Sequence, residues 1–176
     1  MAYIGFRKLM VGATTSTGYA APSALGRAVS MTVTPNSAEG TLYGDDVAVE
    51  HDEAFTDAEI TIGSTYIPVA LYATLFGHTV NDGVVTFNAS DAAPYIGIGA
   101  YAPKKVDGVE KYEAIFLTKV KMSEPEGSYE TKGDSITYNT PEISGVAIAN
   151  DAGVWKITKE CDTAADAETW ITSQFA

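Results

Sequence analysis

The residues of this chain that could carry out chemistry are mostly carboxylates, and the densest group surrounds a histidine. Glu50, Asp52 and Glu53 flank His51. Imidazole and carboxylate side chains can hold a metal ion or transfer a proton. However, His51 has no second ligand at the i, i+4 spacing of a helical metal site, and the segment lacks the spaced Asp or Asn residues and the turn glycine of a calcium loop. We therefore expect a solvated, self-repelling acidic segment that needs a partner.

A second motif is formed by closely spaced glycines. Gly97-Ile-Gly99-Ala-Tyr-Ala102 matches the spacing of a dinucleotide-binding loop, but that loop works only where a helix begins and offers free N–H groups to a pyrophosphate. Pro103 and two lysines follow instead, so we expect a bulky side chain or another backbone close to these glycines. The sequence contains no Walker loop and no nucleophile elbow. It predicts no enzyme and no cofactor, and the remaining enzymatic alternative is a hydrolase using acids such as Asp46.

The charge balance limits the partners. The formal net charge is −12, and residues 28–103 contain ten Asp and Glu residues but no Lys or Arg. Such a surface repels phosphate, so DNA could pass it without specific binding, although the charge could also serve solubility alone. The single Cys161 excludes an intrachain disulfide. The N-terminal residues do not follow the order of a secretory signal, and we expect synthesis in the cytosol without a membrane anchor.

Hydrophobic patterning predicts a mainly β fold with antiparallel strands. Apolar and polar residues alternate in residues 27–34 and 55–63, so each segment is expected to form a strand with one dry face. Turn signals at Asp82-Gly83, Asp107-Gly108 and residues 150–153 lie between apolar runs and predict three hairpins.

The region from residue 112 to 140 predicts two strands joined by a polar loop. Alternate residues from Tyr112 to Met122 are expected to share one half-wet face. Pro125 interrupts strand pairing, and a second strand is expected to begin at Ile136.

Two helices complete the expected single domain, which spans residues 1–176. Residues 67–76 predict a short flanking helix that ends at Gly77. Residues 163–175 predict a C-terminal helix with Thr163 as its cap, and its apolar stripe should dock on the sheet.

The lysines and the longest aperiodic region are candidate contact surfaces. Residues 38–54 lack a clear period, so we expect a long ordered loop that begins after Pro35–Ser37 ends the preceding strand. Asp57 and Glu59 follow on the solvated face of the next strand. The basic residues predict a salt-bridged subunit surface. This basic set consists of Lys104, Lys105, Lys111, Lys119 and Lys121.

Several short motifs occur together in one order over about residues 1–160. They are Thr34–Ser37 with Thr41–Asp46, then Leu75–Thr79 leading to Ala93–Tyr95, and then Met122–Glu126 with Tyr129–Ser135. In this combination the chain resembles the major tail proteins, or tail tube proteins, of long-tailed bacteriophages, in particular the siphophage family often labelled phi13-type. The C-terminal helix departs from the pattern of that family.

The resemblance implies an antiparallel β-sandwich or partial barrel whose subunits close into hexameric rings, and rings that stack into a DNA-conducting tube. It implies a place in the virion tail after synthesis in the host cytoplasm, with the tape measure, terminator and distal tail proteins as further partners. It carries over no catalytic residue. In such a family, residues 38–54 would be an inter-subunit loop. Its candidate contact residues are Leu42, Tyr43, Asp45, Asp46, Val47 and Val49.

Ring assembly also has a physical rationale. Strand edges attract other strands, and closure into a ring removes those edges. Asp57 and Glu59 would then face either the channel or a wet groove. Two alternatives remain open: a monomeric β-sandwich binding or adhesion module, and another virion ring protein such as a tail terminator or head–tail connector.

Overall fold

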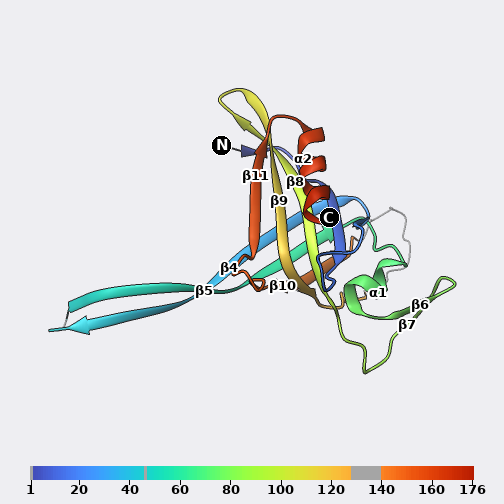
Figure 1. The fold of residues 1–176 in the computed structure, drawn as a ribbon, viewed down its shortest axis with the longest axis horizontal. Coiled ribbons are helices and arrows are strands. Elements are labelled where there is room, and N and C mark those ends of the chain that lie inside the picture. Colours follow the sequence, from blue (N-terminus) through green and yellow to red (C-terminus); the bar gives the residue numbers. More distant parts are fainter. Residues whose placement is uncertain (1, 46, 128–139) are drawn as a thin grey trace, which may run out of the picture.

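The computed structural model describes residues 2–45, 47–127 and 140–176, and it confirms a mainly β fold with two helices (Figure 1). The helices are α1 (Leu71–Phe76) and α2 (Ala164–Gln174). The strands are β1 (Ala2–Tyr3), β2 (Arg7–Ala13), β3 (Ser23–Ala24), β4 (Ala28–Gly44), β5 (Val47–Ser64), β6 (Thr79–Asn81), β7 (Val84–Thr86), β8 (Tyr95–Val106), β9 (Val109–Met122), β10 (Glu142–Ala147) and β11 (Lys156–Cys161).

The main sheet is antiparallel and divides at β9. Its order is β3-β2-β8-β9-β10-β5-β4, while β1 pairs with β8 and β11 with β9. β11 pairs with the first half of β9, and β10 pairs with its last three residues and then with β5. The sheet therefore turns over itself, so that β5 and β10 cover one face of β2, β8 and β9 as in a sandwich (Figure 1).

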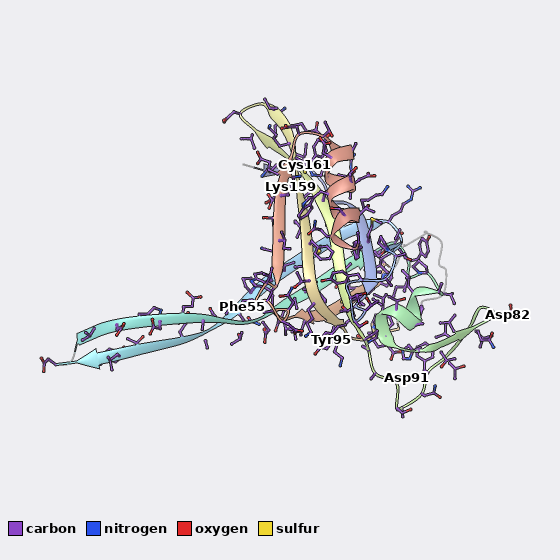
Figure 2. The ribbon with its side chains drawn as sticks, viewed as in Figure 1. Phe55, Asp82, Asp91, Tyr95, Lys159 and Cys161 are labelled. Atoms are coloured by element: carbon purple, nitrogen blue, oxygen red, sulfur yellow. The ribbon has the colours of Figure 1, made fainter. Side chains whose placement is uncertain are left out.

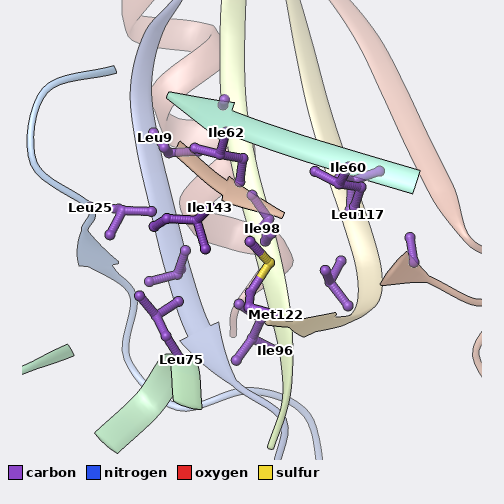
Figure 3. Close-up of a cluster of buried hydrophobic side chains, with 14 of the residues drawn as sticks. Leu9, Leu25, Ile60, Ile62, Leu75, Ile96, Ile98, Leu117, Met122 and Ile143 are labelled. Carbon is purple, nitrogen blue, oxygen red and sulfur yellow. The ribbon is translucent and has the colours of Figure 1, made fainter. Parts of the chain in front are cut away.

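The main hydrophobic core lies between these two layers. Ile60 and Ile62 of β5 reach the cluster that contains Ile98 and Leu117 of the opposite layer (Figure 3). Leu75 of α1 is fully buried at one end of this cluster. Because α1 has only six residues and is marginal alone, its stability comes from this packing.

The C-terminal helix docks on the other face of β8 and β9, as predicted. Thr163 caps it by accepting a hydrogen bond from the Asp166 backbone N–H at 3.1 Å. Ile171 is fully buried on this face, next to Gly99. A side chain on Gly99 would meet Ile171, and one on Gly97 would meet the Tyr19 ring. The prediction that bulky groups lie close to the two glycines is therefore confirmed.

The prediction of one continuous face from Tyr112 to Met122 is wrong. Ile98 pairs with Leu117 but Ile96 pairs with Val120, so β9 contains one extra residue at this point. Such a bulge moves the following side chains to the opposite face. Phe116 consequently packs in the cluster around α2, while Val120 and Met122 pack in the main core.

Two of the three predicted hairpins are confirmed. Asp82-Gly83 joins β6 to β7, and Asp107-Gly108 joins β8 to β9, with positive φ at all four residues. The third is wrong, because β10 and β11 both pair with β9 in succession. Asn150 does make a turn there, since its Oδ1 accepts from the Val154 N–H at 3.0 Å. Turn chemistry thus marks a local bend without specifying which strands pair.

Three segment boundaries also differ from the predictions or lie beyond them. The first helix begins at Leu71 rather than Ile67, although Gly77 ends it with φ 78° as expected. The strand that follows the turn at residues 150–153 begins at Lys156 rather than directly after the turn. The strand expected at Ile136 lies outside the described residues, as does the motif of residues 129–135.

Candidate assembly site

The most distinctive feature of the molecule is a two-stranded arm, which replaces the predicted loop of residues 38–54. β4 and β5 remain paired from the body to the pair Gly44 and Val47, and the hairpin extends away from the other strands (Figure 1). Pro35 does not end β4, contrary to the prediction. β4 is paired on one side only in the described part of the chain, and proline is tolerated on such an edge strand.

The base of the arm is fixed to the body by aromatic packing. Phe55 lies where the arm meets the body (Figure 2). Its ring stacks on Trp155 with centroids 4.7 Å apart and planes inclined by 11°. Nearby, the Asn36 side-chain amide donates to Asp57 Oδ1 at 2.7 Å. These contacts set the direction in which the arm leaves the sandwich.

Beyond this base, the described side chains of the arm are exposed. The segment 38–54 carries six acidic residues and no Lys or Arg. Glu39 stands directly opposite Glu53, an arrangement that destabilises a strand pair. A two-stranded hairpin alone is marginal in water, so this arm needs a partner surface to become rigid.

The tip of the arm combines apolar and acidic groups. Leu42, Tyr43 and Val49 are 60%, 69% and 66% exposed, and we call these three residues the arm tip. Asp45 lies in the turn with φ 51°. Of the other predicted contact residues, Asp46 lies outside the described residues, and Val47 is described only as part of β5.

The histidines have local partners. Thr41 Oγ1 lies 3.0 Å from His51 Nδ1 on the arm. His78 is buried in the body, with Nδ1 2.8 Å from Asp91 Oδ2 and Nε2 3.6 Å from Glu124 Oε2. The Asn88 backbone N–H and His78 lower the pKa of Asp91. The hydrogen bond from His78 to Asp91 therefore joins the start of β6 to the segment after β7. Within the described ranges, no three His, Cys, Asp or Glu residues are grouped to hold a metal.

A second surface is the polar face of β10, β5 and β4. On β5, Ala58 and Ile60 are buried while Glu59 between them is exposed, which confirms the predicted alternation. Asp57, on the same face, is half-buried. The strand pairings place Glu59 in one cross-strand row with other outward-facing residues. The row consists of Tyr95, Lys121, Val146, Glu59 and Thr34.

The prediction of a single basic cluster is wrong. Lys104 and Lys105 lie at one end of the β8–β9 hairpin, whereas Lys119 and Lys121 lie at the other, near Tyr95. Nine residues of extended chain from Tyr95 to Lys104 correspond to about 30 Å. The two lysines near Tyr95 have their Nζ atoms 5.1 and 5.5 Å from its ring centroid. Lys121 therefore shares a face with Glu59 rather than forming a separate surface.

Lys104 is an internal ion-pair residue rather than a surface residue. It is buried, with Nζ 2.7 Å from Glu160 Oε2 and 3.2 Å from Glu113 Oε2. The hydrogen bond to Glu160 is the main reason that the pKa of Lys104 is raised, and it lowers the pKa of Glu160. The prediction of salt bridging is thus confirmed for Lys104, but its assignment to a subunit surface is wrong. Lys105 is exposed.

Sequence reasoning missed a groove at the open end of the sandwich. It has a volume of about 400 Å³ and lies between the N-terminal segment, β4 and the β9–β11 pair. Its floor is formed by Phe6, Met31, Val33 and Ile115, and Lys156 lies at its edge. We call these five residues the groove. The only sequence signal for it was the alternation of residues 27–34, which predicted a dry face for Met31 and Val33.

No protein-family model matches the chain, and no curated protein matches it significantly. No described helix has the length and apolarity needed to cross a membrane. The features of the chain that bear on its function are accordingly the arm, the polar face and the groove.

The three surfaces share one property, a mixture of apolar, polar and charged groups. The arm presents apolar and anionic groups together, the groove presents apolar groups beside Lys156 and Glu113, and the polar face mixes hydroxyls and carboxylates with Lys121 and Tyr95. Interfaces between subunits have a similar makeup, with apolar centres bordered by charged groups.

Proposed function

We propose that this chain is a structural virion protein of a long-tailed phage, which polymerises as stacked hexameric rings to form the tail tube that delivers DNA. The observation that supports this most directly is the arm, which continues two strands of the body into solvent and leaves Leu42, Tyr43 and Val49 exposed. An exposed apolar ribbon of this kind is a hazard in a monomer and is useful when a second copy covers it.

Closure into a ring is supported by the unpaired edges of the sheet. β4 ends the sheet on one side and β3 on the other, within the described part of the chain. Edge strands present rows of free N–H and C=O groups, and copies of the same chain can satisfy these groups around a closed ring. Arm and body are different surfaces, so arm contacts are heterologous and can repeat from ring to ring.

The polar face suits a channel that DNA passes without binding. Its central strands contribute Thr34, Thr61 and Ser144 besides the acids Asp57 and Glu59. The hydroxyls carry no charge and the carboxylates repel phosphate, and the net charge of −12 adds a general repulsion. Lys121 and Tyr95 lie in the same row as Glu59, but on the β8–β9 side of this face. In this proposal β4, β5 and β10 line the channel, and other tail proteins bind at the ends of the tube.

The test is electron microscopy of the purified chain over a range of concentrations and salt. We expect rings or hollow tubes. The decisive variant replaces residues 38–54 by Asn-Gly, which we call the short-arm variant. Ser37 and Phe55 are cross-strand partners, so a two-residue turn can join them without disturbing the body. A wild-type chain that stays monomeric in every condition would contradict the proposal and favour a monomeric binding module.

A further inference from the structure

We propose that the arm tip of one copy inserts into the groove of a second copy. This inference names the receiving surface for the arm, and it depends on the proposed function only in assuming that copies of the chain associate. It follows from two exposed apolar surfaces of the same molecule, the projecting arm tip and the concave groove. Glu50 lies beside the arm tip, and Lys156 lies beside the groove.

The groove is a part of the core that the chain does not fill. Met31 and Val33 point toward the core side of β4, as their alternation predicts, yet both remain half-buried. Across the groove, Phe6 and Ile115 are also half-buried. A concave volume of about 400 Å³ with such a floor is comparable to small binding pockets, which measure about 300–1,000 Å³. Further burial of these side chains requires an apolar occupant.

The arm tip has the size and the chemistry of that occupant. Cross-strand partners project from the same face of a ribbon, and Leu42 is paired with Glu50. Insertion of Leu42 between Met31 and Ile115 would therefore carry a carboxylate to the edge of the groove. Lys156 lies at that edge, with its Nζ 4.8 Å from the Trp155 ring. Glu113 also lines the groove, but its carboxylate is paired with Lys104 at 3.2 Å, so an incoming carboxylate would pair with Lys156.

The groove that receives the tip belongs to another copy. Val33 lines the groove, and Leu42 lies nine residues further along the same strand, about 30 Å away in extended chain. The arm points away from its own body (Figure 1). Because donor and receiver are different surfaces, each copy can give one arm and receive another, and the contact propagates from copy to copy.

A disulfide experiment tests the contact directly. Leu42→Cys on the arm tip is combined with Thr158→Cys, an exposed groove-lining position, in a Cys161→Ala background so that the native thiol takes no part. We expect mild oxidation to give a ladder of dimers, trimers and larger species on a non-reducing gel. The matched control pairs Leu42→Cys with Val109→Cys, which is 57% exposed at the far hairpin and should give no ladder.

Charge reversal gives a second, independent measurement. Lys156→Glu should raise the concentration needed for assembly by roughly two- to fivefold, the size of an exposed ion pair, and Glu50→Lys on the same chain should restore it. Lys159→Glu is the matched control, since Lys159 pairs with Ala114 on the opposite face of the sheet. Replacing Leu42 and Tyr43 together by Ser should have a larger effect, roughly 10- to 100-fold.

The outcomes separate this inference from the proposed function. A ladder without tubes in the microscope would uphold the contact and contradict the tail-tube proposal. Tubes that give no ladder from the Leu42 and Thr158 cysteines, and that are indifferent to Lys156→Glu, would overturn the contact while leaving the tube in place. A monomer that gives no ladder at any concentration overturns both. A groove that binds a hydrophobic dye equally in monomer and assembly also overturns the contact.

Discussion

Removal of the arm should abolish assembly without destabilising the folded body. All described side chains between residues 38 and 54 are exposed, so the short-arm variant removes none of the described buried side chains. It also removes the opposed pair Glu39 and Glu53. The variant shortens the connection between β4 and β5 from 17 residues to two, which is about three halvings of its length. Each halving lowers the entropic cost of closing the loop by about 0.6 kcal/mol. The free energy of unfolding should therefore stay constant or rise by up to about 2 kcal/mol.

The assay combines thermal unfolding with sedimentation. For a chain of this size, 1 kcal/mol corresponds to about 2–4 °C in Tm, so the short-arm variant should melt at the wild-type temperature or up to about 8 °C higher. Wild-type Tm should be measured at a concentration where the chain is monomeric, because assembly itself stabilises the fold. A Tm lowered by more than about 5 °C would show that the arm is part of the core architecture. Unchanged assembly would show that the arm is not the contact.

Three further predictions concern the body. Ile171→Ala should lower the free energy of unfolding by about 2–5 kcal/mol, because this residue of α2 is fully buried against the sheet. Thr172→Ala, on the exposed side of α2, should change the free energy of unfolding by less than about 1 kcal/mol. Denaturant titration distinguishes the two variants. Asp91 and Glu160 have lowered pKa values in the folded chain. The stability that they contribute is therefore complete above their ordinary pKa values of 3.8 and 4.5, and it is lost as the pH falls through the lower pKa values of the folded chain. Asp91→Asn should accordingly reduce the fall of Tm at acid pH in a Tm-versus-pH curve. Lys104→Ala should lower Tm at pH 7 by leaving two carboxylates close together. The loss should shrink as the pH rises above 10.5, the ordinary lysine value, and then through the higher pKa that Lys104 has in the folded chain.

Turns and helix caps could be predicted from the sequence because each depends only on residues that are neighbours in the chain. The glycine turns at residues 83 and 108 require positive φ, which other residues adopt at a cost, so the two hairpins could be predicted from dipeptides. Thr163 and Asp166 likewise determine the start of α2 through two hydrogen bonds between them. The bulge in β9 depends instead on pairing with β8, and it left no trace in the alternation of residues 112–122.

The arm shows why the candidate site was only partly predictable. Alternation of apolar and polar residues identifies a strand only if one face of the strand is buried. The described side chains of residues 38–54 are exposed on both faces of the hairpin. The sequence of this regular hairpin therefore resembled that of an aperiodic loop. The acidic and apolar composition still indicated a segment that needs a partner. The groove could not be found this way, because Phe6, Met31 and Ile115 come from three distant segments that meet only in the folded chain.

One pair of strands connects the core, the polar face and the arm. Within the body, β5 turns Ile60 toward the core and Glu59 toward the polar face; beyond Phe55, the same backbone ladder continues as the arm. Stacking of Phe55 on Trp155 prevents free rotation at the junction. An arm built on a continuous strand pair loses less conformational freedom on docking than a loop of equal length, so more of its contact energy is retained as affinity. In the proposed assembly, the position at which the arm docks would determine the orientation of the polar face, and stacked rings need that orientation to keep one continuous channel.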